Sequence, residues 1–237
     1  MKIRELFIAF LFCANFAYAQ TPKTGEFVVS STPSQIIGGR ATEFNAYIGE
    51  NEKLEWEVYV PENYDANKPA GIMVFAGAPV IVREPAGWLS VMKDKNLIWV
   101  AARKSDNGSS IHQKELLAML SVPLIQKNYN IDDNRIYITG EGRTAARTAL
   151  DYPDIFDGAI FMGDRLWKDD AETKVKNVLN KSFVFVTREA SALPKGNRYG
   201  YNKFRSAGVK NIQIVHIKGS QRYNRPKFAQ SIDYLDG

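Results

Sequence analysis

The sequence predicts one α/β domain in which a mostly parallel sheet has helices on both faces. Two observations support this: several apolar runs have no polar face, and stretches of helical pattern separate them. The apolar runs are residues 71–75, 97–102, 136–139, 158–162, 183–187 and 212–217. The helical stretches are residues 86–95, 112–129, 144–152, 171–180, 199–207 and 226–235. Strands that are apolar on both faces and alternate with helices are typical of a parallel sheet between two helical layers.

Another strand is expected before this series, at residues 54–60. Its side chains Leu54, Trp56, Val58 and Val60 alternate with more polar ones, which predicts a half-covered antiparallel strand. An antiparallel N-terminal strand followed by a parallel series is the three-layer arrangement of α/β-hydrolases. A flavodoxin-like fold is the alternative.

The first 19 residues are predicted to be a secretory signal peptide. Lys2 and Arg4 form a short positive region, residues 6–13 are apolar, and residues 17–19 form a small-x-small cleavage site. A membrane anchor is the alternative, but a spanning helix needs about 20 apolar residues and this run is shorter. We therefore expect export to the bacterial periplasm or to the outside of the cell.

Cysteine usage agrees with this expectation. The only cysteine, Cys13, lies in the leader, and the bulky Phe12 before it argues against a lipoprotein site. The mature chain, starting at Gln20, then has no thiol for a disulfide, a nucleophile or a metal ligand. Its stability must come from the core.

The mature chain is expected to consist of a polar leader segment and a single domain. Residues 20–45 form that segment, with a short strand near residues 27–30, and residues 46–237 form the domain. The formal net charge is +5, and removal of a leader with net charge +1 leaves +4. This weak positive charge does not indicate a nucleic-acid partner. The most basic stretch, residues 195–227, is interpreted as a solvated surface.

One junction between strand and helix carries the main functional signal. In serine hydrolases of this fold the turn has the pattern G-x-S-x-G, and the serine sits at a strained position with positive φ. The sequence here is Gly140-Glu141-Gly142-Arg143-Thr144, so glycine stands where the nucleophile should be. Glycine adopts positive φ without steric cost, so the turn can persist without its hydroxyl. Thr144 stands where the pattern has its second glycine, so a shortened or reshaped turn is the alternative.

Residues 54–235 resemble the secreted esterase and polyhydroxyalkanoate-depolymerase-like branch of the α/β-hydrolase superfamily. The resemblance rests on the order and spacing of several short motifs. They are YVPENY at 59–64, GW at 87–88 with NLIWV at 96–100, NRIYITG at 134–140, DYP at 151–153 and AGVKN at 207–211.

The resemblance implies an acid after the strand at 183–187 and a histidine after the last strand. The first loop offers Glu189 as its only carboxylate, next to Ser191, and the second loop has Gln221 but no histidine. His216 lies inside the strand, and His112 starts a helix in the other half of the chain. Both histidines are interpreted as structural or surface residues, without metal-ligand spacing. All three triad roles are therefore predicted to be vacant.

Two carboxylates could in principle replace the missing nucleophile, because aspartate and glutamate serve as nucleophiles in some hydrolases. Glu141, however, stands one position before the nucleophile site. Asp164 follows the strand at 158–162 but has no evident histidine to orient.

A cleft without its triad could still bind a ligand. The resemblance places Gly77 in the loop that supplies an oxyanion-hole N–H, with Trp88, Arg143 and Asp164 near the cleft. Arg143 could pair with an anionic ligand. Equally, it could pair with Glu141 or Asp164 and fill the cavity.

The sequence therefore predicts an exported pseudo-hydrolase with a binding or accessory role in the cell envelope or outside the cell. It indicates no cofactor and no metal, and the ligand or protein partner stays unknown. A weak or serine-independent esterase acting on an extracellular ester is the first alternative. A structural partner of a homologous active enzyme is the second.

Overall fold

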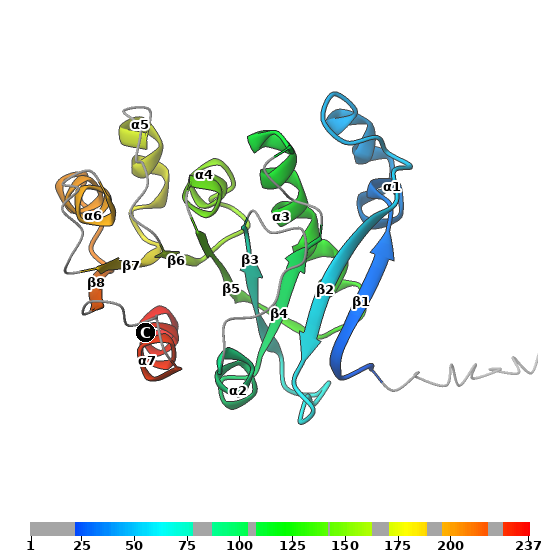
Figure 1. Cartoon of the computed structure of the whole chain (residues 1–237), viewed down its shortest axis with the longest axis horizontal. Helices are drawn as coiled ribbons and strands as arrows, with labels where there is room; N and C mark the ends of the chain where they lie inside the picture. Colours follow the sequence, from blue (N-terminus) through cyan, green and yellow to red (C-terminus); the bar gives the residue numbers. More distant parts are fainter. Residues whose placement is uncertain are drawn as a thin grey trace, which may run out of the picture.

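A computed structural model gives the arrangement of most of the chain. It describes residues 22–77, 87–103, 108–141, 143–162, 171–188, 196–217 and 225–237. Figure 1 shows one twisted sheet with helices on both faces, which confirms the predicted three-layer architecture. Among the helices in these ranges, none combines the length and apolar character that crossing a bilayer requires.

The strands described form one eight-stranded sheet in the order β1-β2-β4-β3-β5-β6-β7-β8. They are β1 (Gly25–Ser31), β2 (Leu54–Val60), β3 (Ala70–Phe75), β4 (Leu97–Ala102), β5 (Ile131–Glu141), β6 (Gly158–Met162), β7 (Ser182–Arg188) and β8 (Ile212–Ile217). β2 pairs antiparallel with both β1 and β4, while β3 to β8 run parallel to one another. This order matches the α/β-hydrolase arrangement and differs from the flavodoxin-like order 2-1-3-4-5.

The helices divide between the two faces of the sheet. On one face lie α1 (Pro33–Ile37), η1 (Gly38–Phe44), α3 (Ile111–Gln126), α4 (Arg143–Asp151), α5 (Ala171–Val175), η2 (Lys176–Val178) and α6 (Asn197–Ser206). On the other face lie α2 (Trp88–Asp94) and α7 (Arg225–Asp236) (Figure 1). Each face has its own buried cluster, the larger including Trp56, Ile138 and Phe183, and the smaller including Trp99 and Phe228.

The segment at residues 22–45, expected to be a loosely attached leader, is built into the sheet. β1 pairs with β2 along its whole length, from Gly25 opposite Val60 to Ser31 opposite Leu54. Thr32 caps α1 in a capping box with Gln35, and Ile36 is buried in the larger core. The strand expected near residues 27–30 is therefore present, and the segment packs more closely than its polar composition suggests.

The helix α7 is tied to the centre of the sheet through its last turn. Arg135 of β5 donates from Nε and Nη2 to the Asp236 carboxylate, each at 2.9 Å, and the Tyr137 hydroxyl donates to Asp236 Oδ1 at 2.8 Å. Burial, and then the neighbouring Asp236, raise the pKa of Tyr137 well above its ordinary value. The Trp88 ring stacks on Phe228 at 3.8 Å between centroids, which joins α2 to α7.

Candidate functional site

The carboxyl ends of the parallel strands meet at one edge of the sheet, where ligands bind in open α/β folds. Each predicted site position follows one of these strands in the sequence. Gly77 follows β3, and the turn at residues 140–144 joins β5 to α4. Asp164 follows β6, Glu189 and Ser191 follow β7, and Gln221 follows β8; these residues lie outside those that the structure describes, as does Gly142.

The turn between β5 and α4 is short and begins at a close contact between two strands. β5 ends at Glu141 and α4 begins at Arg143, so Gly142 alone stands between strand and helix. At Gly140, which has φ of 156°, an added Cβ would lie 1.9 Å from the Ala76 carbonyl oxygen. The ends of β3 and β5 approach so closely that only glycine fits. This contact supports the view that the shape of the turn is kept at its first small position.

Two threonines close to the turn do not supply a replacement nucleophile. Thr139 is wholly buried, and its hydroxyl donates to the Ile160 carbonyl at 2.9 Å. Thr144 is also buried, at 7% exposure, and its carbonyl accepts a hydrogen bond from the Thr148 hydroxyl at 2.8 Å. A nucleophile must present its oxygen to the substrate, so neither side chain suits the role.

The predicted cleft residues fall into different environments. Arg143 is half-buried at the start of α4, and its guanidinium has no hydrogen bond or ion pair within the described part of the chain. Its expected pairing with Glu141 or Asp164 involves side chains outside that part. Gly77 is buried directly after β3. Trp88 is wholly buried, packed edge-on against Trp99 at 6.0 Å, so its indole lies inside the smaller core and not at an open rim.

The positions of both histidines agree with their interpretation as structural or surface residues. His216 is within β8, opposite Thr187 of β7, and its carbonyl accepts a hydrogen bond from Lys227. His112 is in the first turn of α3, with its side chain 49% exposed. Its Nδ1 lies 3.3 Å from Glu115 Oε2, and its ring lies 5.0 Å from that of Tyr47.

A network of charges that sequence reasoning missed crosses the helices next to the turn. The Glu115 side chain is only 3% exposed, and its carboxylate accepts a hydrogen bond from Arg147 Nε in addition to its contact with His112. Arg147 Nη2 lies 3.7 Å from Asp151 Oδ2, and Asp151 also pairs with Lys174 of α5.

The signal for this network was weak in the sequence. The helical spacing of His112 with Glu115, and of Arg147 with Asp151, could have indicated two local pairs. The connection between them depends on α3 packing beside α4, which spacing within one helix does not show. Its arrangement is that of a structural brace, because the buried Glu115 carboxylate contacts both His112 of α3 and Arg147 of α4.

The described residues contain no group of three or more histidine, aspartate or glutamate side chains placed to hold a metal ion.

Comparisons with known proteins give the fold and nothing finer. No family model matches the chain, and no curated protein matches it in sequence. Among solved structures, a thermostable esterase has a TM-score of 0.56 and 16% identity over 79% of this chain and 57% of its own, so the chain spans little more than half of it. A ferulic acid esterase has a TM-score of 0.59 and 14% identity, over 90% of this chain and 99% of its own. A glucuronoyl esterase from Teredinibacter turnerae has a TM-score of 0.60 and 12% identity, over 78% of this chain and 70% of its own. At such identities the likeness establishes that the chain has an α/β-hydrolase-like fold.

Proposed function

We propose that the protein is an exported pseudo-hydrolase: an α/β-hydrolase-fold protein that does not hydrolyse esters and has a binding or accessory role. One observation carries the proposal. Gly142 is the only residue between the end of β5 and the start of α4, which is where the nucleophile of this fold would stand. Thr139 and Thr144 beside it are buried and offer no substitute.

The size of the loss decides between an inactive and a weakened hydrolase. Removing the serine or histidine of a serine-protease triad lowers turnover by about 10⁶, or about 8 kcal/mol of activation free energy. In this chain His112 lies in the first turn of α3 beside Glu115, and His216 lies within β8 opposite Thr187. A loss of this size on more than one triad position leaves no serine-type hydrolysis.

We expect the purified protein to show no turnover of short p-nitrophenyl esters and no labelling by a fluorophosphonate probe. An active serine esterase, assayed under the same conditions, is the positive control. Labelling by the probe would contradict the proposal directly. Turnover that disappears in Glu141→Gln, with unfolding unchanged, would contradict it in favour of the serine-independent esterase.

Export is tested separately. The small-x-small site at residues 17–19 predicts that the mature protein begins at Gln20. Intact-mass measurement of the protein recovered from the periplasm or medium is expected to show loss of the first 19 residues, and Ala19→Arg is expected to block processing. Recovery of the full chain from the cytoplasm alone would count against export without affecting the prediction on hydrolysis.

A further inference from the structure

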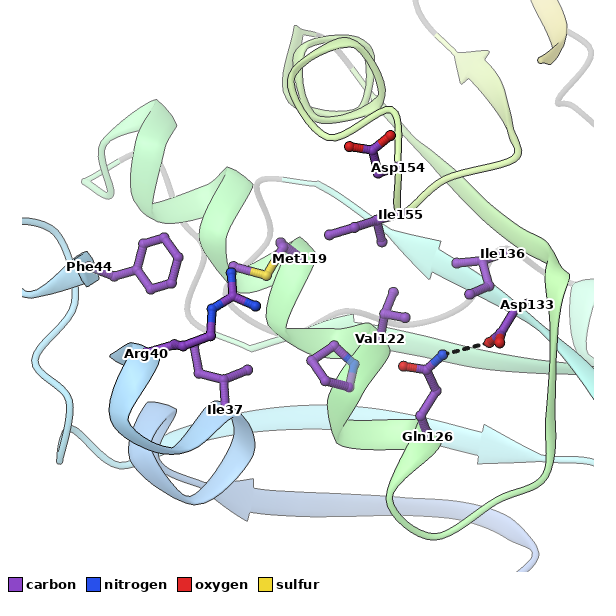
Figure 2. A pocket seen from close by; sticks show the side chains of 11 residues that line it. Ile37, Arg40, Phe44, Met119, Val122, Gln126, Asp133, Ile136, Asp154 and Ile155 are labelled. Carbon is purple, nitrogen blue, oxygen red and sulfur yellow. Dashed lines mark hydrogen bonds between the residues drawn. The ribbon is translucent and has the colours of Figure 1, made fainter. Parts of the chain in front are cut away.

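One open feature away from the β5–α4 turn is a pocket of about 450 Å³ between η1, α3 and the beginning of β5. Met119 and Ile136 contribute to its apolar floor, and Figure 2 shows the Arg40 guanidinium reaching in from η1. Asp133 and Asp154 stand apart on its rim (Figure 2). Because both signs of charge border the pocket, its lining does not select one class of ligand.

The edge of the sheet at β1 is a more specific feature. β1 pairs with β2 on one side, and within the described residues no strand pairs with its other side. The strand, GEFVVSS, follows the ladder without a bulge, has no proline and has one charged side chain, Glu26. Proteins usually protect an exposed edge with prolines, bulges or several charges, because its unpaired backbone groups bind other strands. β1 has little of this protection.

The backbone groups that point outward from this edge can be identified from the far side of β2. The Glu55 carbonyl points toward β4, where it accepts a hydrogen bond from the Arg103 N–H at 2.9 Å. Successive residues of a strand point their backbone groups to opposite sides, so Val58 points toward β1 and bonds with its partner Phe27. The outward N–H and C=O groups of β1 therefore belong to the alternate residues, Glu26, Val28 and Ser30.

These outward residues form a self-complementary set. Val28, at the centre, has an apolar side chain that is 45% exposed. When a second β1 runs antiparallel with Val28 opposite Val28, Glu26 of each copy faces Ser30 of the other. Like charges, which would weaken a strand pair, do not face each other in this register. Each facing pair of these residues can exchange two backbone hydrogen bonds.

The face of β1 toward α3 offers apolar surface to the same partner. Phe27 and Val29 are half-buried there, beside a hollow of about 300 Å³ that Leu124 and Ile125 of α3 also line. In the symmetric pairing, Phe27 of one copy stands opposite Val29 of the other. Both side chains then lose exposed apolar area, which favours association.

We propose that β1 pairs antiparallel with β1 of a second copy of this chain, about a two-fold axis at Val28, so that two sheets join into one. A symmetric pair uses the same surface twice, as is usual in homodimers. A single strand pair is small for a stable interface, so the dimer is expected to dissociate on dilution. The pairing does not depend on the proposed loss of hydrolysis.

Sedimentation velocity over a range of protein concentrations tests the pairing, and the wild type is expected to shift from monomer to dimer as the concentration rises. Val28→Lys and Val28→Glu each place two like charges opposite each other, and each is expected to raise the dissociation constant by about tenfold or more. An equal mixture of the two variants is expected to restore the dimer. Leu179→Lys changes a side chain that is 39% exposed elsewhere and is the matched control, with an unchanged dissociation constant. Monomer at every concentration, or a dimer that persists in Val28→Lys, would overturn the proposal.

An introduced cysteine tests the register. The chain has one cysteine, Cys13, so a Cys13→Ser background has no thiol. Facing residues of a hydrogen-bonded antiparallel pair have Cα atoms about 5.5 Å apart, a distance that a disulfide can span. Val28→Cys in this background is therefore expected to form a covalent dimer under mild oxidation, seen on a non-reducing gel, while Leu179→Cys stays monomeric. Equal cross-linking of the two variants would refute the assigned register.

Discussion

Replacing Glu115 with alanine is expected to lower the free energy of unfolding by about 3–5 kcal/mol. The carboxylate is 3% exposed and receives both Arg147 and His112. Its removal leaves the Arg147 guanidinium, which is 27% exposed, without its main partner between α3 and α4. Denaturant titration followed by far-ultraviolet circular dichroism gives the change in unfolding free energy.

Two further variants separate this effect from a general loss of charge. Glu43→Ala removes an exposed carboxylate, 58% accessible, and is expected to change stability by less than about 0.5 kcal/mol. Replacing both partners, as Glu115→Leu with Arg147→Met, is expected to recover most of the loss, since apolar side chains can substitute for a buried pair. A Glu115→Ala variant as stable as Glu43→Ala would show that the network is not a brace.

Gly140→Ala is expected to destabilise the protein by about 3 kcal/mol, the upper end of what overpacking usually costs. The new methyl group would lie 1.9 Å from the Ala76 oxygen and 2.7 Å from its carbonyl carbon. These are backbone atoms in a tight junction, where the Ala76 N–H also donates to the Thr139 carbonyl at 2.7 Å. Relief therefore requires β3 and β5 to separate at the edge that holds the candidate site.

Two other glycines isolate the contribution of this contact. Gly39→Ala has open space around the new methyl group and is expected to be nearly neutral. At Gly208 φ is 98°, but a Cβ added there would have no neighbouring atom within 4 Å. The Gly208→Ala variant therefore measures backbone strain alone, about 1 kcal/mol. If Gly140→Ala lowers the free energy of unfolding no more than Gly208→Ala does, the close approach of β3 and β5 does not limit stability.

The sequence predicted the bounds of a strand correctly where its apolar pattern matched the burial of the side chains. The strands at Leu54–Val60, Leu97–Ala102, Gly158–Met162 and Ile212–Ile217 have the bounds that their apolar pattern predicts. The length of β5 was underestimated because four of its first five residues, Asp132 to Arg135, are polar. These residues hide a strand that pairs with β3 from Ala70 onward. The helix expected at residues 171–180 is shorter, with α5 ending at Val175 and η2 following.

Only those features of the candidate site that are local in the sequence could be predicted. A turn between a strand and a helix is a local feature, so the vacant position at Gly142 could be found from neighbours in the sequence. The environment of Trp88 could not, because its burial depends on Phe228 of α7, far along the chain. The pocket beside Arg40 was missed for the same reason, since its walls come from segments that only the fold brings together.

The attachment of α7 to β5 also constrains how the chain can fold. Arg135 and Asp236 are 101 residues apart, and Lys95 pairs with Asp233 across 138 residues. The face of the sheet that carries Trp88 is therefore covered only in part, by α2, until residues 225–236 have been synthesised. Contacts of such long range slow folding, because the loop must close before they form. A growing chain can complete the layer of α3 and α4 while the ribosome is still active, but the opposite layer closes only after synthesis has passed the last turn of α7.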